Sequence, residues 1–465
     1  MKRIYTENYV ERRPAARRAS AHGQRSRKPA GKQAREPERR TTRRPARRRG
    51  LNARNPRVWL LGVALALVFI LFVSVLLAAA DASIGPAYAR TVHQFKAPAG
   101  SKAAAPGVWA NAAVLTDGES GRVLYEKNAH EKLPIASTTK MMTALVVRNK
   151  TKLTDKVVVT PEAANVGEES INLVPGETLT VEQLLNVMLI QSANDAAYAL
   201  AQHTGGTIAG FAELMNKEAA AIGAKDSHFT NPHGLDQSGH YSSAYDLAVI
   251  GRALMHDPVL AKIVSTPKYS IPTPNQPWNR VAVGHNEILT QYPGANGIKT
   301  GYTARAGFCL AASASRDNKA LIAVVLNSTH RADDVSALFN YGFASTARIV
   351  LVNQGQKLGT SRVSSFPKRY VTALPSAGMA VLTFKGSNDV FKVTTLVQRK
   401  SPSPVKAGQS IGKIDVALNN APFESEPAVA DRSESKSNFL GAAGAFCWYS
   451  LCWTGKILSA PFRIF

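Results

Sequence analysis

A serine and a lysine near position 140 have the types and spacing of a nucleophile and its base. Ser137 and Lys140 stand three residues apart at the start of a predicted helix, so the amine can reach the hydroxyl on one face. The positive end of the helix favours the charge that develops on the serine oxygen. A lysine that is desolvated or close to another cation has a lowered pKa and can act as a general base. The pair therefore predicts nucleophilic catalysis by serine.

This spacing of serine and lysine recurs at five other places, so the pair is a weak signal by itself. Three of the other pairs have a proline between their members, one lies in a glycine-bearing β segment and one in a polar linker. Only Ser137 begins an amphipathic helix, which continues with the apolar residues of Met141–Val146. The other pairs begin at Ser265, Ser365, Ser403, Ser410 and Ser433.

Two further short motifs carry groups that can bind a peptide. Ser192 and Asn194 lie in a predicted turn between helices, where a hydroxyl and an amide can relay protons and hydrogen-bond a backbone; an ordinary helix cap is the alternative. Ser170-Ile171-Asn172 has the same spacing and competes for this role. Lys299-Thr300-Gly301 begins a predicted strand, where the first two side chains can bind a carboxylate and the glycine allows close backbone approach. A solvated edge strand, which often carries lysine, is the alternative there.

The order of the three motifs is more specific than any one of them. Ser-x-x-Lys, Ser-x-Asn and Lys-Thr-Gly, in this order, are the motifs of β-lactamases and penicillin-binding proteins. The intervals are 55 and 107 residues, with a predicted helical region between them. The chain resembles the low-molecular-mass penicillin-binding proteins, the serine D-Ala-D-Ala carboxypeptidase family. The segments that carry this resemblance are AAVLTDGESGRVLYEKNAHEKLPIASTTKMMTALVV, LNVMLIQSANDAAYALA, FTNPHGLDQSGHYSSAYDLA and NGIKTGYTARAGFCLAASA.

The resemblance implies a role for each matching residue. Ser137 attacks the carbonyl of the penultimate D-alanine, Lys140 accepts its proton, and water then hydrolyses the acyl ester. Ser192 and Asn194 pass protons and position the substrate.

The same resemblance assigns the substrate-binding residues. Lys299 and Thr300 lie near the terminal carboxylate, beside Gly301. The backbone N–H groups of Ser137 and Tyr302 form the oxyanion hole, a kind of donor pair that contributes several kcal/mol to catalysis. Arg331 is a weaker candidate for binding the carboxylate.

Secondary-structure signals predict an α+β fold. Strands at Asn111–Asp117 and Arg122–Asn128 precede a mainly helical insert over about residues 160–265, and Thr180 with Gln183 forms a capping box within it. Three strands, near 297–303, 308–315 and 320–328, and a helix at Asp333–Phe343 follow. We expect a β-lactamase/transpeptidase-like five-stranded antiparallel sheet with helices and a helical insert, then a small all-β domain of sandwich type.

Composition divides the rest of the chain. Residues 1–57 hold 20 Lys or Arg and 4 Asp or Glu, and so carry +16 of the net charge of +25. This composition is typical of a disordered tail. Residues 58–80 form an uncharged run of 23 residues, which as a helix would span roughly 34 Å and could cross a bilayer. The expected order is a cytoplasmic tail and an uncleaved signal anchor, then the parts outside the cell membrane: a linker (81–106), the catalytic domain (107–348), the β domain (349–418), a second linker (419–437) and a membrane-interface helix (438–465).

Two features of the ends remain open. The triplet Ala87-Tyr88-Ala89 is also acceptable as a signal cleavage site. For the last segment the alternative is a helix buried against the protein.

We expect peptidoglycan stem peptides as substrate, β-lactams as inhibitors and the membrane as a partner. The basic tail is adjacent to an apolar run and lacks interleaved aromatic residues, which favours lipid headgroups over nucleic acid. Cys309, Cys447 and Cys452 give no disulfide framework, and no Cys/His cluster has zinc spacing, so neither a metal nor another cofactor is expected.

Several rival functions share these motifs. A class A β-lactamase needs a deacylating Glu followed by an Asn downstream of Ser-x-Asn, whereas Glu168 and Asn172 precede Ser192. A transpeptidase is less favoured because no large module precedes the compact catalytic domain. An endopeptidase that cleaves cross-links would use the same chemistry, and a β-lactam or cell-wall sensor would acylate without turnover.

Overall fold

The computed structural model describes residues 87–365 and 368–435. By internal contacts the chain divides into residues 1–85 and 86–465, and only the second unit is described below. The predicted tail (1–57), signal anchor (58–80) and terminal membrane helix (438–465) lie outside the described residues. Within the described ranges, no helix has both the length and the apolar character needed to cross a membrane.

The catalytic domain is built on one five-stranded antiparallel sheet, as predicted. Its strand order is β3-β2-β10-β9-β8, so two strands from the start of the domain pair with three from its end. The bounds are β2 (Ala112–Asp117), β3 (Val123–Lys127), β8 (Ala295–Thr303), β9 (Gly307–Arg316) and β10 (Lys319–Leu326).

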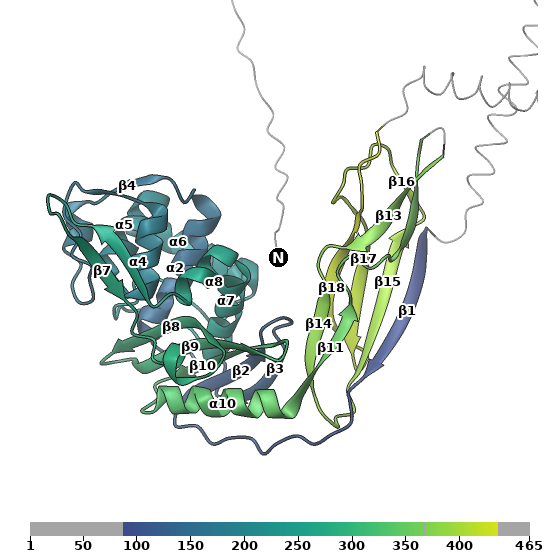
Figure 1. Ribbon diagram of the computed structural model, residues 1–465, viewed down its shortest axis with the longest axis horizontal. Coiled ribbons are helices and arrows are strands. Elements are labelled where there is room, and N and C mark those ends of the chain that lie inside the picture. Colours follow the sequence, from purple (N-terminus) through teal and green to yellow (C-terminus); the bar gives the residue numbers. More distant parts are fainter. Residues whose placement is uncertain (1–86, 366–367, 436–465) are drawn as a thin grey trace, which may run out of the picture. The chain divides into compact units, whose positions relative to one another are not determined.

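The sheet separates two hydrophobic cores, and the alternation of side chains along β10 explains how. Ile322 and Val324 face the core shared with the helical insert, whereas Leu321 and Ala323 face the core beneath α10 (Arg331–Ser345). Figure 1 shows α10 on one face of the sheet and the insert on the other. The sheet is therefore buried on both faces, which fixes the positions of β8 and of the helices above it.

The insert between β3 and β8 is mainly helical, as expected. Thr180 caps α4 through the predicted box, because its hydroxyl accepts from the Gln183 backbone while the Gln183 side chain accepts from the Thr180 backbone. Two short antiparallel pairs that the sequence did not reveal lie among the helices: β4 with β5 and β6 with β7. The bounds are η1 (Ala136–Thr139), α2 (Lys140–Lys150), β4 (Lys156–Val158), α3 (Pro161–Ala164), β5 (Thr178–Thr180), α4 (Val181–Ile190), α5 (Asn194–Gly205), α6 (Ile208–Ile222), α7 (Ala244–His256), α8 (Pro258–Val264), β6 (Lys268–Pro272), β7 (Asn279–Val283) and α9 (Ile288–Gln291).

The β domain consists of two sheets around a third core. A seven-stranded sheet, in the order β1-β15-β17-β18-β13-β12-β16, faces the pair β11-β14. This agrees with the predicted small sandwich. The bounds are β1 (Tyr88–Lys96), β11 (Thr346–Val352), β12 (Gly359–Val363), β13 (Arg369–Pro375), β14 (Met379–Phe384), β15 (Val390–Gln398), β16 (Lys400–Ser401), β17 (Ser410–Leu418) and β18 (Ala421–Ala430).

The predicted linker at 81–106 is wrong for residues 88–96, which form β1. This strand pairs antiparallel with β15 from Tyr88–Gln398 to Lys96–Val390 and adds an edge to the β domain. Its side chains are almost all exposed, with only Ala89 and Phe95 partly buried. The pairing therefore depends on backbone hydrogen bonds, and the sequence has no apolar alternation that would reveal it.

The predicted linker at 419–437 is wrong for residues 421–430, which form β18. Asn419 and Asn420 both have positive φ, 50° and 68°, and make the tight turn that returns the chain from β17. Pro422 and Pro427 argued against a strand in the sequence, because proline has no backbone N–H to donate. Both nevertheless lie in the β17–β18 ladder, whose register shifts at two places. Asparagine adopts positive φ more readily than most residues, so Asn419-Asn420 was the sequence signal that indicated the hairpin of β17 and β18.

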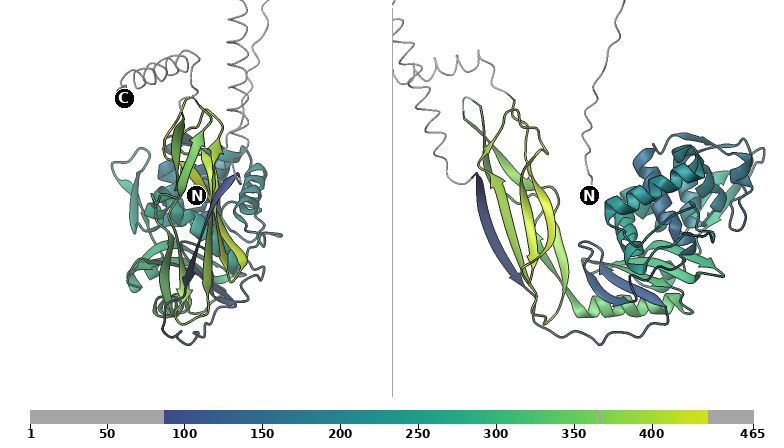
Figure 2. Two further views of the ribbon diagram at one scale, coloured as in Figure 1. Left: turned by 90° about the vertical axis from the view of Figure 1, so that its right-hand side faces the viewer. Right: turned by 180° about the vertical axis from the view of Figure 1, so that it is seen from behind.

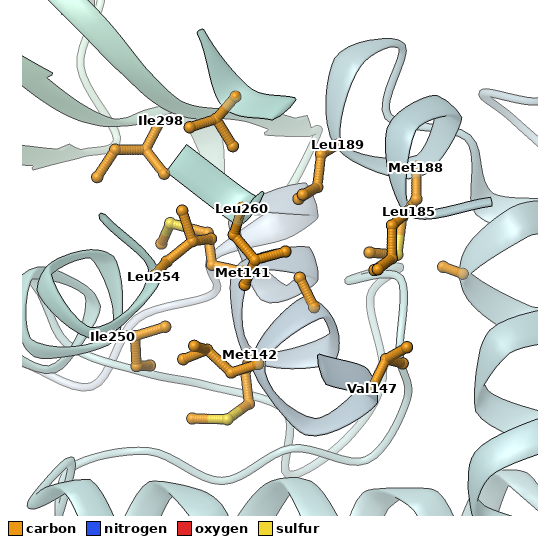
Figure 3. Packing of buried hydrophobic residues seen from close by; sticks show 14 of the residues in the cluster. Met141, Met142, Val147, Leu185, Met188, Leu189, Ile250, Leu254, Leu260 and Ile298 are labelled. Atoms are coloured by element: carbon orange, nitrogen blue, oxygen red, sulfur yellow. The ribbon is translucent and has the colours of Figure 1, made fainter. Parts of the chain in front are cut away.

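We expect replacement of Met142 by Ala to destabilise the catalytic domain by about 2–5 kcal/mol, because this side chain of α2 is fully buried and its loss leaves a cavity. Figure 3 shows Met142 within this core. Urea unfolding should show the loss as a lower midpoint. Val158→Ala, at a side chain that is 60% exposed, serves as the control. Equal midpoints for the Met142→Ala variant and the parent would contradict this packing.

Candidate active site

The nucleophile candidate Ser137 lies in a tight turn in front of α2. Residues Ala136–Thr139 form one turn of 3-10 helix, and α2 begins at Lys140. In a 3-10 turn, side chains three residues apart are aligned, so Ser137 and Lys140 point to the same side. The helix begins slightly later than predicted. The Ser137 side chain is partly exposed, whereas Lys140 is fully buried.

The ammonium of Lys140 has three oxygen acceptors from three parts of the chain. Its Nζ lies 2.8 Å from Ser137 Oγ, 2.7 Å from Asn194 Oδ1 and 2.7 Å from the backbone oxygen of His233. Burial, followed by repulsion from Lys299, holds the pKa of Lys140 well below its usual 10.5. A larger neutral fraction of the amine can therefore accept a proton from the nearby hydroxyl.

The turn that contains Ser192 and Asn194 joins α4 to α5. Both residues are buried, and Ser192 has a positive φ of 74°. The Asn194 amide donates to the oxygen of Gly167 at 2.9 Å, and its backbone N–H donates to the oxygen of Glu169 at 2.7 Å. These bonds fix the amide so that its oxygen faces Lys140. Ser192 lies two residues before Asn194 in the same turn.

The competing Ser170-Ile171-Asn172 segment has a structural role. The Ser170 hydroxyl donates to the carboxylate of Asp195 at 2.5 Å, and the backbone N–H groups of Ile171 and Leu173 also donate to it. The segment thus binds the first turn of α5 and holds the loop against Asn194.

Strand β8 brings the third motif against the nucleophile turn. A Cβ atom added to Gly301 would lie 3.0 Å from the oxygen of Ile135 and 3.1 Å from the nitrogen of Ser137. A larger residue here would crowd the two backbones, so glycine favours their close approach. Lys299 and Thr300 are buried in the strand, while Tyr302 is 56% exposed and its ring lies 4.6 Å from that of Phe308.

The second lysine of the site also has a lowered pKa. Burial lowers the pKa of Lys299 to about 8, with Glu169 opposing the effect and Arg331 adding to it. Its ammonium donates to the oxygen of Thr300 at 3.0 Å. Lys299 and Lys140 are close enough for like-charge repulsion to lower the pKa of Lys140. A buried lysine thus lies close enough to the base to act on it electrostatically, which suits a substrate with a carboxylate.

Arg331 lies at the start of α10 and already has an anionic partner. Its guanidinium forms a two-point ion pair with Glu287 at 2.7 and 3.0 Å and lies 5.3 Å above the Phe308 ring. The Glu287 pairing holds the guanidinium in place and competes with any substrate carboxylate. The structure thus groups Ser137, Lys140 and Asn194 by direct contacts, with β8 packed against them, and places Arg331 in a separate ion pair.

Comparison with known proteins identifies the family. D-alanyl-D-alanine carboxypeptidase (peptidase S11) matches residues 99–330, and the C-terminal domain of penicillin-binding protein 5 matches residues 349–436. The chain is 34% identical over 343 residues to D-alanyl-D-alanine carboxypeptidase DacF of Bacillus subtilis, covering 71% of this chain and 87% of the relative. It is also 34% identical to DacC of Escherichia coli, covering 74% and 88%. This chain belongs to the D-alanyl-D-alanine carboxypeptidase family.

Solved structures agree with this assignment. Penicillin-binding protein 5 of Haemophilus influenzae has a TM-score of 0.56 at 30% identity and covers 72% of this chain and 100% of its own. A mutant of the Streptomyces K15 DD-transpeptidase has a TM-score of 0.50 at 31% identity, covering 51% and 99%. The predicted family, fold and class of enzyme, a serine-type D-Ala-D-Ala carboxypeptidase, are confirmed.

Sequence reasoning missed the loop between α6 and α7, which completes the carboxypeptidase site. His233 contributes its backbone oxygen to Lys140, and the Asn231 side chain accepts from the Gly234 backbone at 2.7 Å to shape this turn. The segment FTNPHGLDQSGHY was part of the family resemblance, and its Asn, Pro and Gly residues indicated a turn. No local pattern indicated that a backbone carbonyl would meet Lys140.

A buried histidine of the same loop supports the nucleophile turn. The backbone N–H of Thr230 donates to Nδ1 of His240 at 3.1 Å, so Nε2 carries the proton and donates to the Thr139 hydroxyl at 2.8 Å. That hydroxyl donates to the oxygen of Ala136 at 2.8 Å. Burial lowers the pKa of His240 to about 4, so the imidazole stays neutral near pH 7. A neutral hydrogen-bond chain thus holds the residue before Ser137 in its left-handed conformation.

We expect Lys299→Gln to move the acidic limb of the pH profile for acylation by penicillin to higher pH. The substitution removes the positive charge that, after burial, lowers the pKa of Lys140, so that pKa rises. Because the base must be neutral, a raised pKa leaves less of it active at low pH. The rate of the parent should also fall on the basic side near pH 8, where Lys299 becomes neutral, and the variant should lack this fall.

The matched control is Lys262→Gln, which removes an exposed lysine from α8. Its acidic limb should coincide with that of the parent in measurements of the second-order acylation rate against pH. An acidic limb that stays in place or moves to lower pH in Lys299→Gln would contradict the coupling of the two lysines.

Proposed function

We propose that this enzyme removes the terminal D-alanine from peptidoglycan stem peptides through an acyl ester on Ser137, and that β-lactams inhibit it by acylating the same oxygen. The observation that carries the proposal is the fully buried amine of Lys140, 2.8 Å from the Ser137 hydroxyl. In the first step the neutral amine takes the hydroxyl proton while the oxygen attacks the carbonyl of the penultimate residue.

The substrate approaches along β8. The ammonium of Lys299 and the hydroxyl of Thr300 bind the terminal carboxylate, which explains why a cation is buried next to the base. The backbone N–H groups of Ser137 and Tyr302 bind the developing oxyanion. Support comes from Gly301, where an added Cβ atom would lie only 3.1 Å from the Ser137 nitrogen, so the strand packs closely against the nucleophile turn.

The amine that leaves must receive a proton. Protonated Lys140 is the nearest donor, and Ser192 and Asn194 complete the path and hold the peptide. Water then attacks the acyl ester, with Lys140 again as base, and the shortened stem peptide leaves.

We expect Ser137→Ala to abolish labelling by penicillin and release of D-alanine from a diacyl-Lys-D-Ala-D-Ala peptide. Lys140→Ala should fold and acylate at least ~100-fold more slowly, because general-base catalysis is lost. The matched control is the double variant Ser265→Ala, Lys268→Ala, which removes an exposed pair of the same spacing. Near-normal acylation of the Lys140→Ala variant would exclude Lys140 as the base.

The same assay separates the enzyme from its rivals. A sensor would be labelled at Ser137 without release of D-alanine, and an endopeptidase would cleave cross-linked muropeptides faster than the diacyl peptide. The likeness to a DD-transpeptidase makes transfer to an added amine the second candidate. Glu168 and Asn172 lie before Ser192, so a class A β-lactamase has no support from motif order.

We propose further that residues 58–80 and 438–465 attach the enzyme to the cell membrane, with the catalytic domain outside and the basic tail in the cytoplasm. Support comes from the uncharged run of 23 residues and the basic charge that precedes it. If the triplet Ala87-Tyr88-Ala89 were cleaved, the enzyme would lose the first residues of β1.

Membrane attachment predicts that the full chain stays with the membrane fraction after alkaline carbonate washing. A chain without residues 1–80 should lose its membrane-spanning anchor, and washing should release it, because an interfacial helix binds reversibly. Release of the full chain under the same wash would contradict the anchor.

A further inference from the structure

The seven-stranded sheet of the β domain has two chemically different ends. At one end Lys96 of β1 pairs with Val390, and Asp389 forms a 2.8 Å ion pair with Arg122 of the catalytic domain. At the other end Tyr88 pairs with Gln398, where β15 runs into the following loop. We call this second end the distal end. It comprises residues 87–90, 362–365, 368–370, 399–409 and 430–435.

Positive charge is concentrated at the distal end. Its described residues include eight Lys or Arg side chains and two carboxylates, a net charge of +6. The rest of the described β domain (91–96, 346–361, 371–398 and 410–429) has six basic and four acidic residues. The distal basic residues are Arg90, Arg362, Lys368, Arg369, Arg399, Lys400, Lys406 and Arg432, and the acidic ones are Asp431 and Glu434.

Ion pairing involves only part of this charge. Arg369 pairs with Glu434 at 3.0 Å, and Arg432 pairs with Glu434 and Asp431 at 3.3 and 3.4 Å. These two arginines share both carboxylates, so the described residues of the distal end hold six more basic than acidic side chains. Five of the other basic side chains are exposed and come from three separate segments. They are Arg90, Lys368, Arg399, Lys400 and Lys406.

Two exposed tyrosines accompany the basic residues. Tyr88 is 45% exposed and Tyr370 is 49% exposed, and both lie within the distal end. Tyrosine is enriched where proteins meet the membrane–water interface, since its ring is apolar and its hydroxyl polar. Lysine and arginine with interspersed tyrosine are the side chains expected on a surface that contacts lipid headgroups.

Both ends of the described chain also lie here. The backbone N–H of Arg399 donates to the oxygen of Ala87 at 2.9 Å, and that of Glu434 donates to the oxygen of Val405 at 2.7 Å. The chain thus enters and leaves the domain beside one loop, 399–405. Six residues, 81–86, separate this point from the uncharged run at 58–80 and reach at most about 22 Å.

We propose that the distal end is a docking surface for a membrane that contains anionic phospholipids. Its lysines and arginines bind headgroup phosphates, and Tyr88 and Tyr370 insert their rings at the headgroup level. Docking would fix the orientation of the β domain relative to the membrane. The inference depends on the proposed membrane attachment for its biological setting, but the binding can be measured without residues 1–86 and 436–465.

The experiment uses residues 87–435, which contain all three hydrophobic cores of the described chain. Co-sedimentation is measured with vesicles of phosphatidylcholine mixed with an equal amount of phosphatidylglycerol, and with vesicles of phosphatidylcholine alone. The test variant replaces Arg90, Lys368, Arg399 and Lys406 by Gln. The control replaces Lys96, Lys152, Lys217 and Lys392 by Gln, so that both variants lose four positive charges.

The parent and the control should bind the anionic vesicles, and the test variant should bind at least tenfold more weakly, because each basic residue near an anionic surface contributes roughly fivefold. Added salt should weaken the binding of the parent. Circular dichroism and thermal unfolding confirm that each variant is folded, independently of activity.

Three results would overturn the docking surface: no binding of the parent to anionic vesicles, equal binding to neutral vesicles, or equal losses in the two variants. Binding to a soluble anionic wall polymer without binding to vesicles would also overturn it and indicate a different partner. D-alanine release by the same fragment is measured separately in solution, so a failure of the carboxypeptidase activity and a failure of lipid docking remain distinguishable.

Discussion

The amine of Lys140 is completely buried. The rest of the active site depends on the hydrogen bonds that offset the free-energy cost of burying it. A charged ammonium in an apolar interior is strongly unfavourable unless it is hydrogen-bonded. Here three oxygens surround it, from Ser137, Asn194 and His233, and none of these segments is adjacent in the chain to the other two. Burial and the nearby Lys299 still lower its pKa, so the acceptors hold the amine in place without removing its capacity to act as a base.

This arrangement requires unusual backbone conformations at the points where the segments meet. Ala136 and Ser192 have positive φ, 47° and 74°, which costs of order 1–3 kcal/mol at each residue other than glycine. Hydrogen bonds from neighbouring segments hold both backbone conformations in place. The chain from His240 through Thr139 holds the carbonyl of Ala136, and the loop at Gly167 and Glu169 binds the turn after Ser192. Figure 2 shows the helical insert and α10 on opposite faces of the sheet. The two cores between these layers keep the turns in register with β8.

The sequence was sufficient for the parts that are local or that carry a recognisable order. The motifs at Ser137, Ser192 and Lys299 predicted the family, and the periodic segments predicted the sheet built from both ends of the domain. The sequence was insufficient to predict interactions that are made by backbone groups alone. The carbonyl of His233 has no side-chain signature, and β1 pairs through its backbone with little apolar burial. Glu287, the ion-pair partner of Arg331, is 44 residues away in the chain, and no sequence pattern indicated this pairing.

The most direct test of this account is the titration of Lys140 itself. Lysine labelled with ¹³C at Cε gives a resonance that moves with the charge of the amine, and comparison with the Lys140→Arg variant assigns it. The account predicts a midpoint well below 10.5, so that a substantial part of the amine is neutral when the enzyme acylates. A midpoint at or above 10.5 would contradict it, because Lys140 would then be charged throughout the working range and unable to take the proton of Ser137.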